Sequence, residues 1–179
     1  MVKNKITFED VGQITIQTLS KAANLDNPTP STMEDAQYSI PFVIAATLVE
    51  GEFGPDQMTF EKLHDQKILA VAKKVRVEAV PEFDKFFPEL IKNQVQITTK
   101  QGVCFSAQSQ KVKGDDNSPL SDAEIKNKFA WLSRNRLDKF QARTVVADVW
   151  SIEEQPNINK FINSVQFDAD KFNKSGEKK

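Results

Sequence analysis

The run from Asp35 to Gly51 constrains the fold of this chain more than any other part of its sequence. It reads DAQYSIPFVIAATLVEG, and it is too apolar along its whole length to lie on a protein surface. The acidic residues Glu34 and Asp35 suit the positive end of a helix, and Gly51 suits the residue that ends one. Pro41 removes one backbone donor inside the run, so it predicts either a kink or a helix that begins again there. The sequence therefore predicts a buried helix over residues 33–50, interrupted near the proline.

The composition is typical of a globular protein and excludes two classes of partner. The chain has 179 residues, of which 39% are hydrophobic and 27% are charged, enough for one core with a helical appendage. Its formal charge of −1 gives no electrostatic reason to expect nucleic acid or a membrane surface as partner. No apolar run approaches the roughly 20 residues that a membrane-spanning helix needs. Cys104 is the single cysteine and cannot form an internal disulfide, so we expect a cytoplasmic location.

Segments of alternating polarity predict β-strands on both sides of the helical region. Residues 11–19, 75–79, 94–98 and 103–107 alternate between polar and apolar side chains. The last two segments flank a short turn that ends at Gly102, which predicts an antiparallel hairpin. One face of this hairpin would carry its apolar side chains, Val95, Ile97, Val103, Phe105 and Ala107.

Capping patterns and helical spacing predict the remaining elements. Thr59 suits the N-cap of a short helix, and Ser121 with Glu124 forms the pattern of a capping box that opens a longer one. Further helices are predicted over residues 60–64, 66–74, 139–150 and 157–165. The order of strand, helices, strands and helices predicts an α+β fold, with a small antiparallel sheet packed with helices and followed by C-terminal helices.

Several stretches, in the same order along the chain, resemble the MmgE/PrpD family, which includes 2-methylcitrate dehydratase, cis-aconitate decarboxylase and iminodisuccinate epimerase. The resembling stretches are Glu9-Asp10-Val11 with Ile14-Thr15-Ile16, Asp35 to Gly51, Val75-Arg76-Val77, Val95 to Gly102, and Gly114 to Ser121 with Lys128-Phe129. Together they resemble the small C-terminal or lid domain of the family. On this basis we divide the chain into a lid domain over residues 6–137, C-terminal helices over 138–168, and a disordered tail over 169–179.

The resemblance implies a chemistry that this chain holds only in part. Family members act on small di- and tricarboxylates without an organic cofactor, and they use histidine and lysine to move a proton beside a carboxylate. Their active site lies in a cleft between the lid and a large helical domain, and most of the catalytic residues come from the helical domain or from the segment that enters the lid. Those parts have no counterpart in the sequence, so we name no catalytic residue and expect no cofactor.

His64 and Cys104 are the natural candidates for chemistry, and both have simpler explanations. His64 is the only histidine, and it follows a short predicted helix, where a histidine commonly caps carbonyl groups or meets solvent. It matches no catalytic histidine of the family. One histidine and one cysteine cannot build an ordinary zinc site, so no metal is expected, and Cys104 is interpreted as a partly buried, inert thiol.

Ser39 and Tyr38 are the candidate substrate-binding residues. Ser39 matches a serine of the family, whose hydroxyl would bind a substrate carboxylate; the alternative is that it bonds to a helix carbonyl beside Pro41. At Phe42, many family members look to have tyrosine instead. Tyr38 lies about one helical turn before Phe42 and would offer a substitute hydroxyl. The alternative is that Phe42 belongs to the core and that this chain lacks the contact.

Four residues after the hairpin complete the candidates. Lys111 and Lys113, beside the loop that starts at Gly114, would attract carboxylates at a cleft mouth or simply face water. The loop lacks the sequence of a phosphate-binding loop. Lys128 and Phe129 match a lysine–phenylalanine pair of the family, and we interpret Phe129 as a core residue and Lys128 as structural.

The apolar side chains of the C-terminal helices predict an interface. They are Phe140, Val145, Val146, Val149, Trp150, Ile158, Phe161, Ile162 and Val165. In the family, this part of the chain packs against the helical domain. Large exposed apolar surfaces usually mark interaction sites. We therefore expect either a helical catalytic domain as partner or self-association through these helices.

Two functions follow from the sequence. The first is a lid domain that needs a helical catalytic domain to act on a 2-methylcitrate-like carboxylate, and that is inactive alone. The second is a remnant or repurposed module that binds or supports another molecule without a reaction, which Phe42 in place of tyrosine favours. Whether the chain is an enzyme in its own right is left open.

Overall fold

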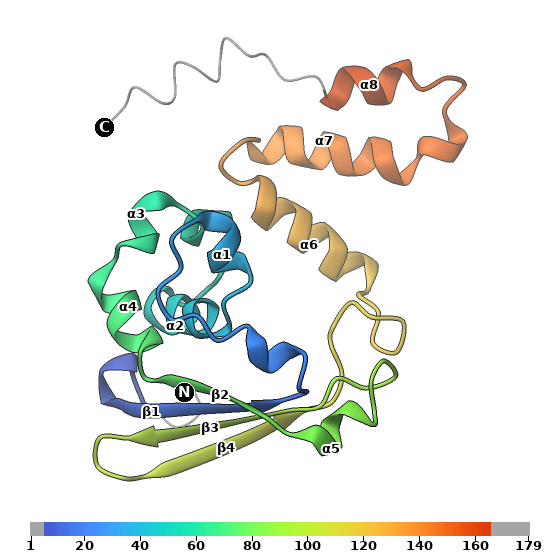
Figure 1. Cartoon of the computed structure of the whole chain (residues 1–179). Helices are drawn as coiled ribbons and strands as arrows, with labels where there is room; N and C mark the ends of the chain where they lie inside the picture. Colours follow the sequence, from blue (N-terminus) through green and yellow to red (C-terminus); the bar gives the residue numbers. More distant parts are fainter. Residues whose placement is uncertain (1–5, 166–179) are drawn as a thin grey trace. The chain divides into compact units, whose positions relative to one another are not determined.

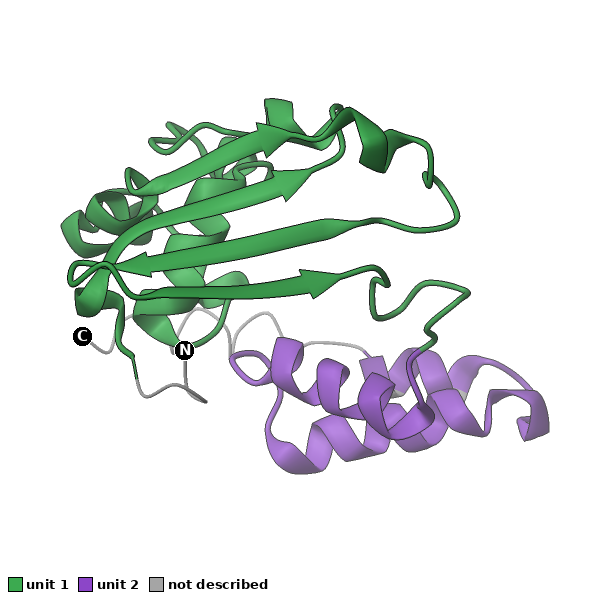
Figure 2. Cartoon of the chain, turned by 90° about the horizontal axis from the view of Figure 1, so that it is seen from below, with its two compact units in different colours: residues 1–119 green, residues 120–179 purple. Residues whose placement is uncertain are grey.

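The computed structural model describes residues 6–165 and divides the chain into two compact units, residues 1–119 and 120–179 (Figure 2). The boundary between the units lies before the helix that begins at Asp122. The lid domain expected from the sequence extends further, to residue 137. The predicted tail over residues 169–179, and residues 166–168 of the predicted C-terminal helices, lie outside the described residues. No helix within residues 6–165 combines the length and apolarity needed to cross a bilayer.

The first unit is built on a four-stranded sheet in the order β2-β1-β3-β4. The strands are β1 (Val11–Thr18), β2 (Val75–Ala79), β3 (Asn93–Thr99) and β4 (Cys104–Ser109). The predicted hairpin is β3 and β4, which pair antiparallel with Val95 opposite Ala107. Gly102 in the turn has φ of 84°, a left-handed conformation that glycine adopts without strain.

The first two strands pair parallel, so the sheet is mixed rather than wholly antiparallel. Ile14 of β1 lies opposite Val75 of β2, while β1 and β3 run antiparallel. A helical crossover between β1 and β2 returns the chain to the starting edge of the sheet and makes them parallel. The α+β class predicted from the sequence is confirmed.

Helices cover one face of this sheet (Figure 1). They are α1 (Met33–Gln37), α2 (Ile40–Glu50), α3 (Phe60–Leu63) and α4 (Gln66–Ala72), and a short α5 (Pro81–Asp84) follows β2. Single 3-10 turns stand at η2 (Phe8–Asp10), η3 (Ala22–Asn24) and η4 (Pro55–Gln57).

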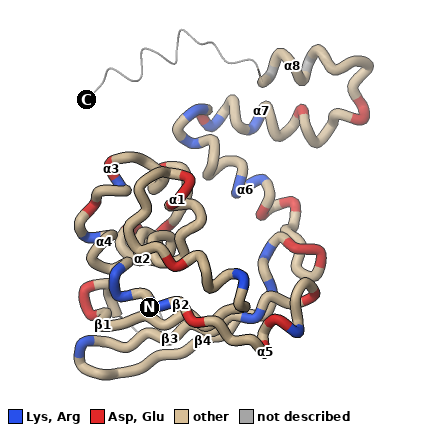
Figure 3. The backbone as a smooth tube through the Cα atoms, in the orientation of Figure 1, with Lys and Arg blue, Asp and Glu red and all other residues tan. Residues whose placement is uncertain are grey.

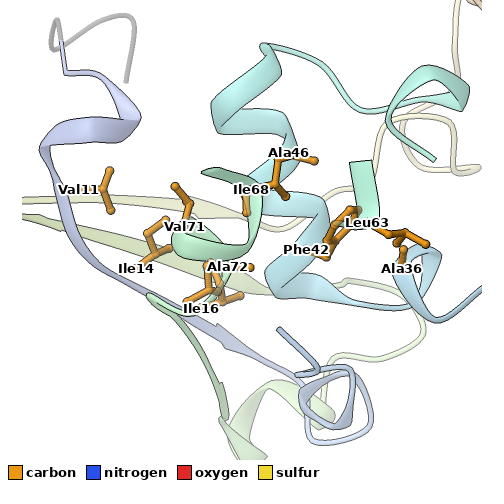
Figure 4. Close-up of a cluster of buried hydrophobic side chains, with 12 residues drawn as sticks. Val11, Ile14, Ile16, Ala36, Phe42, Ala46, Leu63, Ile68, Val71 and Ala72 are labelled. Atoms are coloured by element: carbon orange, nitrogen blue, oxygen red, sulfur yellow. The ribbon is translucent and has the colours of Figure 1, made fainter. Parts of the chain in front are cut away.

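The core of the first unit lies between β1 and the two helices α2 and α4 (Figure 4). From Ile14 to Thr18 the buried side chains of β1 alternate as the sequence pattern predicts, whereas Val11 is out of phase because the pairing with β3 shifts register between Val11 and Gln13. Phe42 of α2 and Ile68 of α4 are both fully buried and belong to the same cluster as Ile14 and Ile16, and Phe42 lies beside Leu63 (Figure 4). The prediction that Phe42 is a core residue is therefore confirmed.

The predicted helix over residues 33–50 is two helices. The chain leaves helical geometry at Tyr38 and Ser39, and α2 then begins with Pro41 in its first turn, where proline removes no helical hydrogen bond. Gly51 ends α2 with φ of 86°. Of the two alternatives for Pro41, the helix that begins again is the correct one.

The second unit is helical and consists of α6 (Asp122–Ser133), α7 (Lys139–Trp150), η5 (Ile152–Glu154) and α8 (Asn159–Val165). Ser121 accepts a hydrogen bond from the N–H of Glu124, and the Glu124 carboxylate accepts one from the N–H of Ser121, which confirms the predicted capping box. Asp138 caps α7 in the same way. α7 packs against both α6 and α8.

Candidate functional site

The chain turns sharply between α1 and α2, and Ser39 lies buried at that turn. Its side chain is only 1% exposed. The Ser39 hydroxyl donates a hydrogen bond to the carbonyl of Asn27 and accepts one of 3.0 Å from the N–H of Phe42. Ser39 is therefore the N-cap of α2 and also fastens the linker before α1 to this helix. Both hydrogen bonds of the hydroxyl, to Asn27 and Phe42, stabilise the fold. Neither is made with the helix carbonyl beside Pro41 that the sequence analysis gave as the alternative.

Tyr38 and Phe42 lie in different environments. Tyr38 is the C-cap of α1 and is 65% exposed, whereas Phe42 is fully buried. The expectation that their side chains lie one helical turn apart is wrong, because the helix is interrupted between them and the spacing rule holds only within a continuous helix. The Tyr38 hydroxyl faces water and cannot replace a hydroxyl at Phe42.

Polar groups converge where the linker enters α1. The Asp35 carboxylate accepts hydrogen bonds from the Ser31 hydroxyl, at 2.8 Å, and from the N–H groups of Ser31 and Thr32. These hydrogen bonds hold the pKa of Asp35 below its ordinary value, and the bond from the Ser31 hydroxyl has the largest effect. The carboxylate is thus committed as the second half of the α1 capping box, not as a proton acceptor.

A hollow of about 370 Å³ lies beside this turn, between α1 and α3. Its wall combines the hydroxyls of Ser31 and Thr32 with the apolar side chains of Met58 and Phe60, and it includes the carboxylate of Glu34. No lysine or arginine lines it. A carboxylate ligand is repelled by Glu34 and finds no cation in this hollow, so recognition of a carboxylate there requires positive charge from outside the hollow.

His64 is held as a helix cap. Its Nδ1 lies 2.8 Å from the carbonyl oxygen of Phe60, and the two rings are 4.4 Å apart between centroids. The side chain is exposed at the end of α3. The structure agrees with the interpretation of His64 as a capping residue.

Three lysines from distant parts of the sequence meet at another hollow, of about 310 Å³, and the sequence analysis missed them. They are Lys67, Lys74 and Lys100, with Glu9 on the same wall. The Lys74 ammonium donates to the carbonyl of Val11 at 2.7 Å, so one of the three charges is used to fasten β1 to α4. Only the packing of β1 on α4 joins these residues, and no local sequence signal marks them.

The remaining candidates are Cys104 and the four residues named after the hairpin. Lys111, Lys113 and Lys128 are exposed, and Phe129 is half-buried on α6 rather than in the core of the first unit. Cys104 is exposed, not partly buried as predicted, because it lies on the same exposed face of the hairpin as Gln96, whose side-chain nitrogen is 2.8 Å from the sulfur. Within residues 6–165, no three side chains of histidine, cysteine, aspartate or glutamate come together as metal ligands would.

The apolar side chains of the C-terminal helices are largely uncovered within the described part of the chain. Phe140 is 78% exposed, and Val149, Trp150, Ile158 and Ile162 are also exposed. Val145 is buried, and Val146, Phe161 and Val165 are half-buried.

The fold is that of a small α+β domain followed by helices. Comparison with known proteins agrees with this description: the sequence model of the MmgE/PrpD C-terminal domain matches residues 1–152. The chain therefore belongs to the MmgE/PrpD family, over the family's C-terminal or lid domain.

A curated relative gives the scale of the match. The chain is similar to cis-aconitate decarboxylase of Mus musculus, with 25% identity over 131 residues. The match covers 73% of this chain and 26% of the mouse enzyme. The chain thus spans about a quarter of the length of that relative.

Proposed function

We propose that this chain is the lid of a MmgE/PrpD-type lyase for small di- or tricarboxylates, and that it turns over substrate only together with a helical catalytic domain. The observation that carries the proposal is the extent of the match, which is confined to a C-terminal domain and to about a quarter of a cis-aconitate decarboxylase. A cytoplasmic location is part of the proposal and is supported by the single cysteine.

The state of the polar side chains supports the need for a partner. His64 is occupied with the carbonyl of Phe60, and Asp35 is occupied with the start of α1. The hollow at α1 offers hydroxyls without a cation. Proton transfer beside a carboxylate needs an acid and a base held opposite the substrate, and positive charge to hold its carboxylates. We assign those groups to the helical domain, with Tyr38 on the lid side of the substrate and Ser39 fastening the turn that carries it.

The position of Phe42 favours a second candidate function, a binding or structural module that performs no reaction. The ring is fully buried in the core, so the phenyl group serves packing. A lid that has lost its contact with the substrate would keep such a side chain without penalty.

Activity assays on the full chain, with and without a helical-domain protein of the same family from the same organism, separate these functions. The chain alone should consume neither cis-aconitate nor 2-methylcitrate, and the mixture should consume one of them. Turnover by the purified chain alone contradicts the proposal. A mixture that forms a stable complex but has no activity, while an intact family member is active in the same assay, favours the second candidate.

A further inference from the structure

An open groove of about 990 Å³ lies within the second unit, between α6 and α7. Its floor is apolar and includes Phe129, Leu137, Val146 and Trp150. Each of the two helices has 12 residues, so the groove is about 18 Å long, the length of roughly three helical turns. A pair of helices leaves such a seam open unless a third helix fills it.

The rim of the groove is basic. Lys126, Arg134, Lys139 and Arg143 line it, and Asp138 is the one acidic residue that does. Figure 3 shows blue segments of the tube, which mark lysine and arginine, at the turn from α6 to α7 and along both helices. The Asp138 carboxylate accepts the N–H groups at the start of α7 and keeps its charge, so the rim carries four basic side chains against one acidic side chain.

Two of the rim cations have no partner of opposite charge. Lys139 and Arg143 form no ion pair within the part of the chain that the structure describes. Lys126 lies over the ring of Trp150, with its nitrogen 4.4 Å from the ring centroid, so the cation borders the apolar floor directly. An occupant of the groove therefore meets an apolar strip with positive charge along its edges.

We propose that this groove docks an amphipathic helix of another polypeptide, with an apolar stripe that is flanked by acidic residues. The length of the groove accommodates about three turns of helix. The apolar stripe of the docked helix would pack on the apolar floor, and its acidic residues would lie beside the basic side chains of the rim. A second copy of this chain is a poor occupant, because docking groove to groove would place the two basic rims against each other. The proposal concerns the second unit alone and does not depend on the proposed enzymatic function.

A synthetic peptide provides a direct probe. We would use a labelled peptide of about 15 residues with leucines at helical spacing and glutamates on both flanks. The matched control peptide replaces every glutamate with lysine. Fluorescence anisotropy on the full chain should show saturable binding of the glutamate peptide and at least about tenfold weaker binding of the lysine peptide, with the difference shrinking as salt is added. Trp131→Phe leaves Trp150 as the single tryptophan, and its emission should shift on binding.

Variants locate the binding site. Arg143→Glu should lower the affinity for the glutamate peptide about three- to tenfold. Ala147→Phe, at an exposed position in the groove, should abolish binding by filling the seam. Lys128→Glu is the matched control, because Lys128 lies on α6 but does not line the groove, and binding should be unchanged.

Three results would overturn the proposal. The first is the absence of saturable binding to the full chain, and the second is equal binding of the two peptides. The third is a dimer of the chain in light scattering that Ala147→Phe dissociates, which would make a second copy the occupant. Circular dichroism of each variant verifies that the helices remain, and Arg143→Glu, at an exposed site, provides the test if Ala147→Phe does not fold.

Discussion

Replacing Ser39 with alanine tests whether its hydroxyl is structural. The change removes the N-cap of α2, which typically costs about 1 kcal/mol of the free energy of unfolding. It also leaves the carbonyl of Asn27 without the hydroxyl that donates to it, and an unsatisfied, partly buried acceptor costs about 1 kcal/mol more. We therefore expect Ser39→Ala to lower the free energy of unfolding by about 2 kcal/mol.

Urea unfolding followed by far-ultraviolet circular dichroism measures this loss. With a slope of about 2 kcal/mol per molar urea, the midpoint should fall by about 1 M. Hydrogen exchange at the N–H of Phe42 should accelerate, because that group loses its acceptor. Tryptophan emission is unsuitable, since Trp131 and Trp150 both belong to the second unit.

Thr59→Ala provides the matched control. Thr59 caps α3 with a 3.3 Å hydrogen bond at an exposed position, so its removal should cost only about 0.5 kcal/mol, at the low end for N-caps. If the free energy of unfolding of Ser39→Ala lies within about 0.5 kcal/mol of that of the unchanged chain, the two hydrogen bonds contribute little and the structural reasoning is refuted. Ser39 would then return to consideration as a residue kept for a ligand.

Three further predictions address the core, the acid side of the stability curve and the lid surface. Phe42→Tyr should cost about 1–3 kcal/mol in urea unfolding, because the added hydroxyl enters a fully buried site, whereas Phe60→Tyr at an exposed ring should be neutral; equal effects would contradict this. Hydrogen bonds from the Ser20 hydroxyl and N–H hold the pKa of Asp84 below its ordinary value. This carboxylate therefore stabilises the fold fully at pH values above its pKa in the unfolded chain, about 3.9, and the stabilisation is lost as the pH falls through its pKa in the folded chain. Asp84→Asn should therefore flatten the acid-side loss in a pH series of unfolding, and an unchanged slope would exclude the role of Asp84. Tyr38→Phe should leave the free energy of unfolding within about 0.5 kcal/mol of that of the unchanged chain, because the side chain is exposed. The same change should lower turnover in the assembly with a helical domain, and unchanged turnover would remove Tyr38 from the substrate-binding residues.

The elements that the sequence predicts well depend on short-range patterns. Thr59 and Ser121 each lie three residues before the group that they cap, so both caps can be read directly from neighbouring residues. The alternation along β1 likewise specifies which side chains are buried. The family resemblance was also visible in local stretches, and the match over residues 1–152 confirms it.

The features that the sequence analysis missed depend on distant contacts. The hydrogen bond from Ser39 to the carbonyl of Asn27 was missed because Asn27 lies 12 residues away across a linker. The exposure of Cys104 is an exception, because alternation along β4 already places its side chain on the face opposite Phe105. The meeting of Lys67 and Lys100 at one hollow likewise requires the packed fold.

The parallel pairing of β1 has a consequence for the synthesis of the protein. β1 is made first, yet both of its neighbours in the sheet come later, and its contact with β2 joins Gln17 to Glu78 across 61 residues. At about 5–20 residues per second, a ribosome needs roughly 3–12 s to supply that partner. During this interval β1 has two open hydrogen-bonding edges and an apolar face, the properties that lead nascent strands to aggregate. A chaperone that holds the β1 segment as it emerges should therefore raise the yield of folded protein more than one that acts after the chain is released.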